Sequence, residues 1–177
     1  NNEQNENLSS ENRSHENHIS VNYTISNYSV RDNTQYKDRV ISMEEVNSLS
    51  EINLICKNGN FSEVKYLQLT KELKSKIESQ IGTKIDEVIV KKKYLPNTNF
   101  DIDLMFEKEV NCLKSLFGMK HFPFLLSYDL EEKTIILNYC GKSITSDNIP
   151  ENWKKQADKI INSLQKNEIY HNDLWFN

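Results

Sequence analysis

Cysteine is scarce in this chain, and the three cysteines, Cys56, Cys112 and Cys140, are widely spaced with no C-x-x-C pair. Disulfide frameworks use even sets of cysteines, and zinc sites use closely spaced ligands, so the sequence favours neither. We expect three reduced thiols, as in a cytoplasmic protein.

Long apolar runs and an excess of positive charge are missing too. No run approaches the roughly 20 apolar residues of a membrane-spanning helix, and the N-terminal region has no apolar signal core. The formal net charge is −4 at pH 7, which gives no basic field for a nucleic acid or an anionic membrane surface. We therefore expect a cytoplasmic protein that has neither nucleic acid nor membrane as a partner.

The chain begins with a long polar segment. Residues 1–42 are rich in Asn, Ser and Glu and have almost no apolar periodicity. Such a segment cannot bury enough surface to offset the loss of chain entropy, so we expect a disordered tail. At its end, Ser42-Met43-Glu44-Glu45 has the form of a capping box and predicts the start of a short helix.

A hairpin with a glycine at its turn is predicted next. Apolar and polar residues alternate from Glu51, Asn58-Gly59-Asn60 is a turn signal, and Val64 to Leu69 has the pattern of the returning strand. Glycine lets backbone N–H groups come close to a phosphate, because it has no Cβ atom in the way. A plain hairpin turn is the alternative interpretation of Gly59.

Two amphipathic helices are predicted in the middle of the chain, over residues 70–81 and 101–117. Gly82 directly follows the first helix, where a C-cap glycine is expected. The apolar positions are Leu73, Ile77 and Ile81 in the first helix, and Phe106, Val110, Leu113 and Phe117 in the second.

A β-branched stretch over residues 87–94 predicts a strand that ends in three lysines. Strand alternation places Lys91 and Lys93 on one face and Lys92 on the other. On the helix that follows, Glu109 lies beside the apolar stripe, and a carboxylate at the rim of a buried face requires a cationic partner. Lys91 is the candidate, although three adjacent lysines leave the register open by one; a solvated strand end and a surface glutamate are the alternatives.

The last third of the chain predicts two strands and a helix. Apolar runs at 124–128 and 134–139 are joined by a polar turn, which is the pattern of a hairpin. Pro150 suits the first turn of a helix, and an apolar stripe continues from Trp153 to an end near Asn167.

The final stretch, residues 169–177, contains His171-Asn172-Asp173-Leu174 directly after this helix. It resembles the catalytic loop of the protein kinase-like phosphotransferases, His-x-Asp-Leu-x-x-x-Asn. The order of glycine hairpin, lysine strand, glutamate helix, strand pair and second helix is also similar to that family. The resemblance implies an α+β fold, with an N-lobe over residues 43–138 and the hinge, first helix and catalytic loop of a C-lobe over 139–177.

The resemblance also implies catalytic roles. Lys91 would bind the phosphates of ATP, and Glu109, in a sequence similar to the family's helix signature, would hold Lys91 in place. Asp173 would accept the proton of the attacking hydroxyl, while His171 would brace the loop.

The nucleotide site implied by the resemblance has two further parts. Gly59 would cover the phosphates, with Val64 beside it, and the backbone of Tyr139 and Cys140 in the hinge would bind adenine. The implied cofactors are ATP and Mg²⁺. Because the metal-binding Asn would stand at position 178, we expect the chain to be part of a longer enzyme and to be inactive by itself.

The sequence indicates the acceptor of the phosphoryl group less clearly than it indicates the family. Protein kinases usually have His-Arg-Asp-Leu-Lys in this loop, whereas Asn172 and Trp175 stand here, and His-Asn-Asp is close to the loop of choline- and ethanolamine-type kinases. We expect transfer to a protein Ser/Thr hydroxyl, with a small-molecule kinase, including the aminoglycoside type, as the alternative. The sequence is also compatible with a pseudokinase or binding module, and with an unrelated α+β interaction domain.

Overall fold

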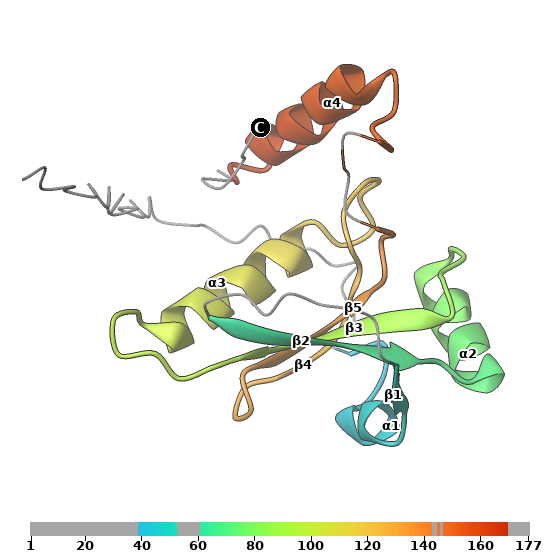
Figure 1. Cartoon of the computed structure of the whole chain (residues 1–177), viewed down its shortest axis with the longest axis vertical. Coiled ribbons are helices and arrows are strands. Elements are labelled where there is room, and N and C mark those ends of the chain that lie inside the picture. The colour runs from blue at the N-terminus through green and yellow to red at the C-terminus, as the bar shows by residue number, and fades with distance from the viewer. Residues whose placement is uncertain (1–38, 53–60, 143–144, 146, 170–177) are drawn as a thin grey trace, which may run out of the picture.

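The computed structural model describes residues 39–52, 61–142, 145 and 147–169. Within this part, the chain is α+β: five strands form one antiparallel sheet in the order β1-β2-β3-β5-β4, accompanied by four helices (Figure 1). The strands are β1 (Ser50–Ile52), β2 (Ser62–Gln68), β3 (Val88–Tyr94), β4 (Leu125–Asp129) and β5 (Thr134–Asn138). The helices are α1 (Met43–Asn47), α2 (Lys71–Ile81), α3 (Ile102–Ser115) and α4 (Trp153–Lys166).

The predicted signals at the helix ends are confirmed for α1 and α2. The Ser42 hydroxyl accepts a hydrogen bond from the N–H of Glu45, and the Glu45 carboxylate accepts one from the N–H of Ser42, so the capping box is complete. Thr70 caps the start of α2 through the N–H of Leu73. Gly82 ends α2 at φ 69°, a left-handed conformation that is open to glycine without a Cβ penalty.

The two later helices are also confirmed, with small changes at their ends. Helix α3 begins after Asp101, whose carboxylate accepts a hydrogen bond from the N–H of Leu104. Helix α4 begins at Trp153, three residues after Pro150, and ends at Lys166, with Asn167 as its C-cap. Pro150 thus precedes the helix instead of lying in its first turn.

Each face of the sheet carries its own core. Helix α3 covers one face, while α1 lies beneath the other (Figure 1). Alternate residues of each strand supply the two cores, because side chains along a strand point to opposite faces. The α3 side contains Tyr94, Phe106, Val110, Leu113, Leu125 and Ile135. The opposite side includes Val46 of α1, Leu73 and Ile77 of α2, and Leu67, Ile89, Leu126 and Ile136 of the strands.

The segment before α1 is part of the fold. Val40 and Ile41 are 4% and 1% exposed and belong to the core on the α1 side. Their backbone N–H groups both donate to the carbonyl oxygen of Leu126, at 2.9 and 3.2 Å. The prediction that the disordered tail extends to residue 42 is therefore wrong for residues 39–42. Two adjacent apolar residues show no periodicity, so the sequence pattern did not reveal their burial. Residues 1–38 lie outside the described residues.

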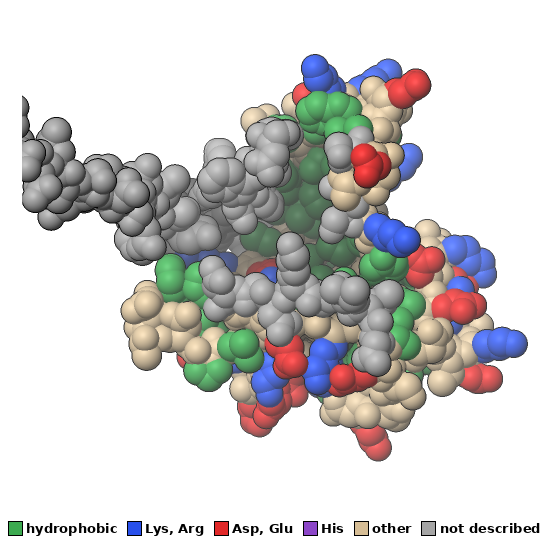
Figure 2. Space-filling view, in the orientation of Figure 1, with side chains coloured by type: hydrophobic (Ala, Val, Ile, Leu, Met, Phe, Trp, Pro, Cys, Tyr) green, Lys and Arg blue, Asp and Glu red, His purple; other side chains and the backbone are tan. Residues whose placement is uncertain are grey.

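Helix α4 packs against the C-terminal end of α3. Leu164 and Ile169 are buried against Leu116, with Cys112 and Ile160 at the edge of the contact. Figure 2 shows hydrophobic side chains in the recess between α4 and the layer formed by α3 and the sheet. Helix α4 is thus tied to the rest of the fold through the end of α3 and the segment that follows it, which adds Met119 and Phe122 to the contact.

None of the helices in the described ranges combines the length and the apolar character that crossing a lipid bilayer requires.

Candidate functional site

The three lysines at the end of β3 point to alternate faces of the sheet, as predicted. Lys91 lies on the α1 side, where its ammonium donates to Oδ1 of Asn47 at 3.3 Å. Lys93 shares that face and pairs with Glu132 at the β4–β5 turn. Lys92 lies on the other face, beneath α3.

Lys92, and not Lys91, is the partner of Glu109. Its Nζ lies 2.6 Å from Oε2 of Glu109, and the two side chains are 26% and 27% exposed. The predicted pair of Lys91 and Glu109 is therefore wrong by one residue, because α3 docks on the face that holds Tyr94 and Ile135, and Lys92 shares that face. The broader prediction, that a lysine of this strand forms an ion pair with Glu109, is confirmed.

Tyr94 is a third member of this cluster. Its hydroxyl donates to the same Oε2 atom of Glu109, and Nζ of Lys92 lies 4.8 Å from the centre of its ring. Tyr94 is 6% exposed, and its ring meets that of Phe106 of α3 edge-on, with 5.9 Å between the ring centres. The ion pair is thus fixed to the core of the α3 side by an aromatic residue.

An apolar, half-buried surface lies next to the ion pair on the same face. Val64 of β2 is the cross-strand partner of Lys92, and Tyr66 is the partner of Val90, which in turn is the partner of Leu137. Directly opposed residues of antiparallel strands share a face, so these side chains lie side by side with Lys92. All four are of intermediate burial. A flat apolar group bound here would lie beside a lysine that is already oriented by a carboxylate.

Residues 138–141 lead out of β5 at the edge of this surface. The Tyr139 ring meets the Tyr66 ring edge-on, with 5.7 Å between the centres. The side chain of Asn138 fixes the start of the segment by accepting a hydrogen bond from the N–H of Phe124 at 2.6 Å. The structure therefore brings Val64, Tyr139, Lys92 and Glu109 to one face of the sheet.

Two thiols border the site, and each has a raised pKa. For Cys140, loss of solvation raises the pKa and the charge of Asp86 adds to it, while a hydrogen bond with Asn138 acts in the opposite direction. For Cys112, burial raises the pKa, and the nearby carboxylate of Glu109 raises it further. Both groups are protonated thiols at neutral pH and are poor nucleophiles in that form.

Several predicted site residues lie outside the described residues. Gly59, at the predicted hairpin turn, falls between the ends of β1 and β2, which are paired as predicted. His171 and Asp173 come after Ile169, the last residue that the structure describes. Their predicted roles as phosphate cover, loop brace and base stay predictions.

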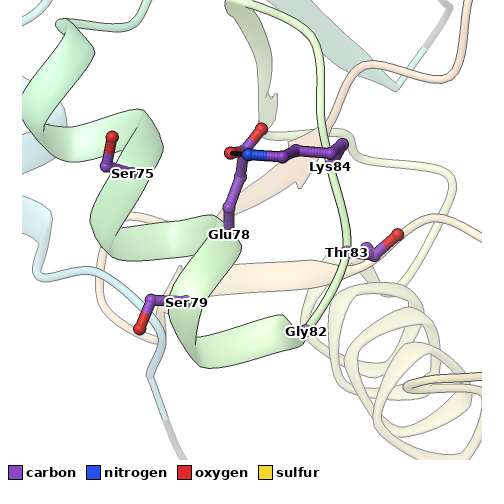
Figure 3. A pocket seen from close by; sticks show the side chains of 6 residues that line it. All are labelled: Ser75, Glu78, Ser79, Gly82, Thr83 and Lys84. Atoms are coloured by element: carbon purple, nitrogen blue, oxygen red, sulfur yellow. Dashed lines mark hydrogen bonds and ion pairs between the residues drawn. The ribbon is translucent and has the colours of Figure 1, made fainter.

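A shallow depression lies elsewhere, at the C-terminal end of α2 (Figure 3). Glu78 and Lys84 face each other there, with 2.7 Å between their charged atoms, and Glu78 also accepts from the N–H of Ile85. The hydrogen bond from Lys84, then that from Ile85, lowers the pKa of Glu78. The charges of Glu78 and Lys84 neutralise each other. Helix α2 packs on the face of the sheet opposite α3. The depression is therefore separate from the lysine–glutamate site.

Among the described residues, no group of three or more His, Cys, Asp or Glu side chains could hold a metal ion.

No protein-family model matches this chain, and no curated protein or solved structure is significantly similar to it. What the site can bind is therefore inferred from its residues and their geometry alone.

The sequence interpretation missed two members of the site, Lys92 and Tyr94. The signal for Tyr94 was present, since a residue two positions after Lys92 on a strand shares its face. The spacing could not show which face α3 would cover, and that choice decides which lysine meets Glu109.

Proposed function

We propose that this chain carries the nucleotide-binding part of an ATP-dependent phosphotransferase similar to the protein kinase-like superfamily. The observation that carries the proposal is the ion pair of Lys92 and Glu109, which joins a central strand to the main helix beside an apolar surface. A lysine ammonium has three N–H donors, so one bond to Glu109 leaves two for phosphate oxygens.

The residues of the site fit the parts of ATP. The apolar surface formed by Val64, Val90 and Leu137 suits a purine base, while backbone groups of Tyr139 and Cys140 at its edge suit the polar rim of that base. Lys92 would hold phosphate oxygens, and Glu109 would keep the ammonium in position. Mg²⁺ would come bound to the phosphates, where it neutralises their charge.

Phosphoryl transfer depends on positioning and charge stabilisation more than on covalent chemistry of the protein. In the proposed reaction, Lys92 stabilises negative charge on the phosphates, and Asp173 accepts the proton of the acceptor hydroxyl. A protein Ser/Thr hydroxyl is the acceptor to test first, and a small hydroxyl compound such as an aminoalcohol or aminoglycoside is the alternative. Nucleotide binding without transfer to either acceptor class would indicate a binding module.

The test of nucleotide binding is a melting experiment on the unaltered chain. At a Mg·ATP concentration about 100 times Kd, binding stabilises the folded state by about 2.7 kcal/mol, which raises Tm by roughly 5–10 °C. Mg²⁺ alone is the control and should leave Tm unchanged. An equal Tm with and without Mg·ATP, at concentrations up to several millimolar, would contradict the proposal.

The thiol of Cys140 reports on the location of the nucleotide. Because its pKa is raised, we expect slow reaction with iodoacetamide at pH 7 and faster reaction as the pH rises and thiolate forms. Mg·ATP at about ten times Kd should slow this alkylation about tenfold, since bound nucleotide covers the segment. Cys112, which lies at the contact of α3 with α4, is the internal control and should react equally with and without nucleotide. Peptide mass spectrometry separates the two rates, and equal protection of both thiols would argue against binding at residues 139–140.

A further inference from the structure

Tyr94 carries a hydroxyl at a place where packing alone requires only a ring. Tyr94 is 6% exposed, and its ring fills the core on the α3 side together with Phe106. A phenylalanine would supply the same ring contacts. Removing a hydroxyl from water costs free energy unless the hydroxyl forms a hydrogen bond. The partner of the Tyr94 hydroxyl therefore shows what the hydroxyl does here.

The partner of this hydroxyl is the oxygen atom that also binds the lysine. Oε2 of Glu109 accepts from both Nζ of Lys92 and the hydroxyl of Tyr94. Two donors from two directions fix the carboxylate in one orientation. The ring of Tyr94 also faces the ammonium, with Nζ of Lys92 4.8 Å from the ring centre, which is within the range of a cation–π contact.

We propose that Tyr94 is a positioning residue that orients Glu109, and through it Lys92, for binding the phosphates of the nucleotide. This inference rests on the proposed function of the site. Tyr94 itself is not required to touch the nucleotide. Without its hydroxyl, Glu109 is held by Lys92 alone, and the pair can shift together away from the phosphate position.

The test compares the affinities of Mg·ATP and adenosine, measured by calorimetry on the full chain. Tyr94→Phe keeps every ring carbon and should weaken Mg·ATP binding about 3- to 10-fold, the loss expected for one hydrogen bond. Adenosine has no phosphate, so its Kd should change less than about twofold. A structural role for Tyr94 would weaken both ligands equally, and so would partial unfolding, because unfolded molecules bind neither ligand. Equal weakening overturns the inference.

A matched control is available at Tyr128. Its hydroxyl also contacts α3, accepting from Nζ of Lys114 at 2.9 Å, but it lies apart from Glu109. Tyr128→Phe should leave the ratio of the two affinities unchanged.

A double-mutant cycle tests the route of the effect. In a Lys92→Met background, Tyr94→Phe should change the Kd for Mg·ATP less than about twofold, because the residue through which it acts is gone. A full 3- to 10-fold loss in that background overturns the inference. Failure of the unaltered chain to bind Mg·ATP overturns the proposed function and this inference together, whereas binding that Tyr94→Phe leaves intact overturns the inference alone.

Discussion

Replacing Lys92 by methionine is expected to weaken Mg·ATP binding about 10- to 100-fold, whereas the same change at Lys91 leaves the Kd within about twofold. A hydrogen bond from a charged donor contributes about 1.5–3 kcal/mol, which corresponds to this range. Lys92 lies under α3 with Glu109, while Lys91 points to the other face and donates to Asn47. Calorimetric titration of both variants with Mg·ATP makes the measurement.

Lys92→Met and Lys91→Met are the same substitution at adjacent positions. Comparing them distinguishes an effect of the position of the lysine from an effect of losing one positive charge. Methionine keeps most of the lysine stem and removes the ammonium. Thermal unfolding of both variants should show that the fold is retained, because each side chain is only partly buried. Equal weakening by the two changes would indicate a general effect of charge, and stronger weakening by Lys91→Met would favour Lys91 as the phosphate-binding lysine.

Phe106→Ala is expected to be the most destabilising of these substitutions, lowering the free energy of unfolding by about 3–5 kcal/mol. Phe106 is 0% exposed and belongs to the core that joins α3 to the sheet, where its ring contacts Tyr94. Its removal leaves a cavity directly beneath the segment that carries Glu109. Urea unfolding followed by circular dichroism measures the loss.

Phe100→Ala is the control for that experiment. Phe100 is 46% exposed and contacts the ring of Phe61, with 4.6 Å between the ring centres. One exposed ring contact supports a loss of about 1 kcal/mol or less. Similar losses for Phe106→Ala and Phe100→Ala would mean that α3 is not held by the core on the sheet face that it covers.

Local signals in the sequence were sufficient to predict most of the elements. The helix over residues 70–81 followed from apolar spacing and Gly82, and the hairpin of β4 and β5 followed from two apolar runs around a polar turn. These signals depend on neighbours within a few residues, so tertiary contacts did not alter them. The burial of Val40 and Ile41 was missed because it depends on the distant strand β4, where the carbonyl of Leu126 accepts both of their N–H groups.

The site was less predictable than the fold because it depends on how α3 lies on the sheet. Strand alternation correctly separated Lys92 from Lys91 and Lys93, but the choice between the two faces required the position of α3. Tyr94 illustrates the same limit, since its pattern predicts a buried strand residue and its hydroxyl acquires a role only from Glu109. An ion pair between a strand and a helix is a long-range contact. A shift of one residue along the strand moves the side chain to the other face of the sheet, so a small error in register changes the partner.

Helix α3 makes two contacts whose combination has a mechanical consequence. Its 14 residues form a helix about 21 Å long, which packs on the sheet through Phe106, Val110 and Leu113 and on α4 near Cys112 and Leu116. Glu109 lies within the part of α3 that packs on the sheet, one turn before Cys112. Because α4 contacts α3 one turn beyond Glu109, a tilt of α4 would act on the helix close to the residue that forms the ion pair. The helix that supplies Glu109 to the ion pair is therefore also the element that joins the pair to α4.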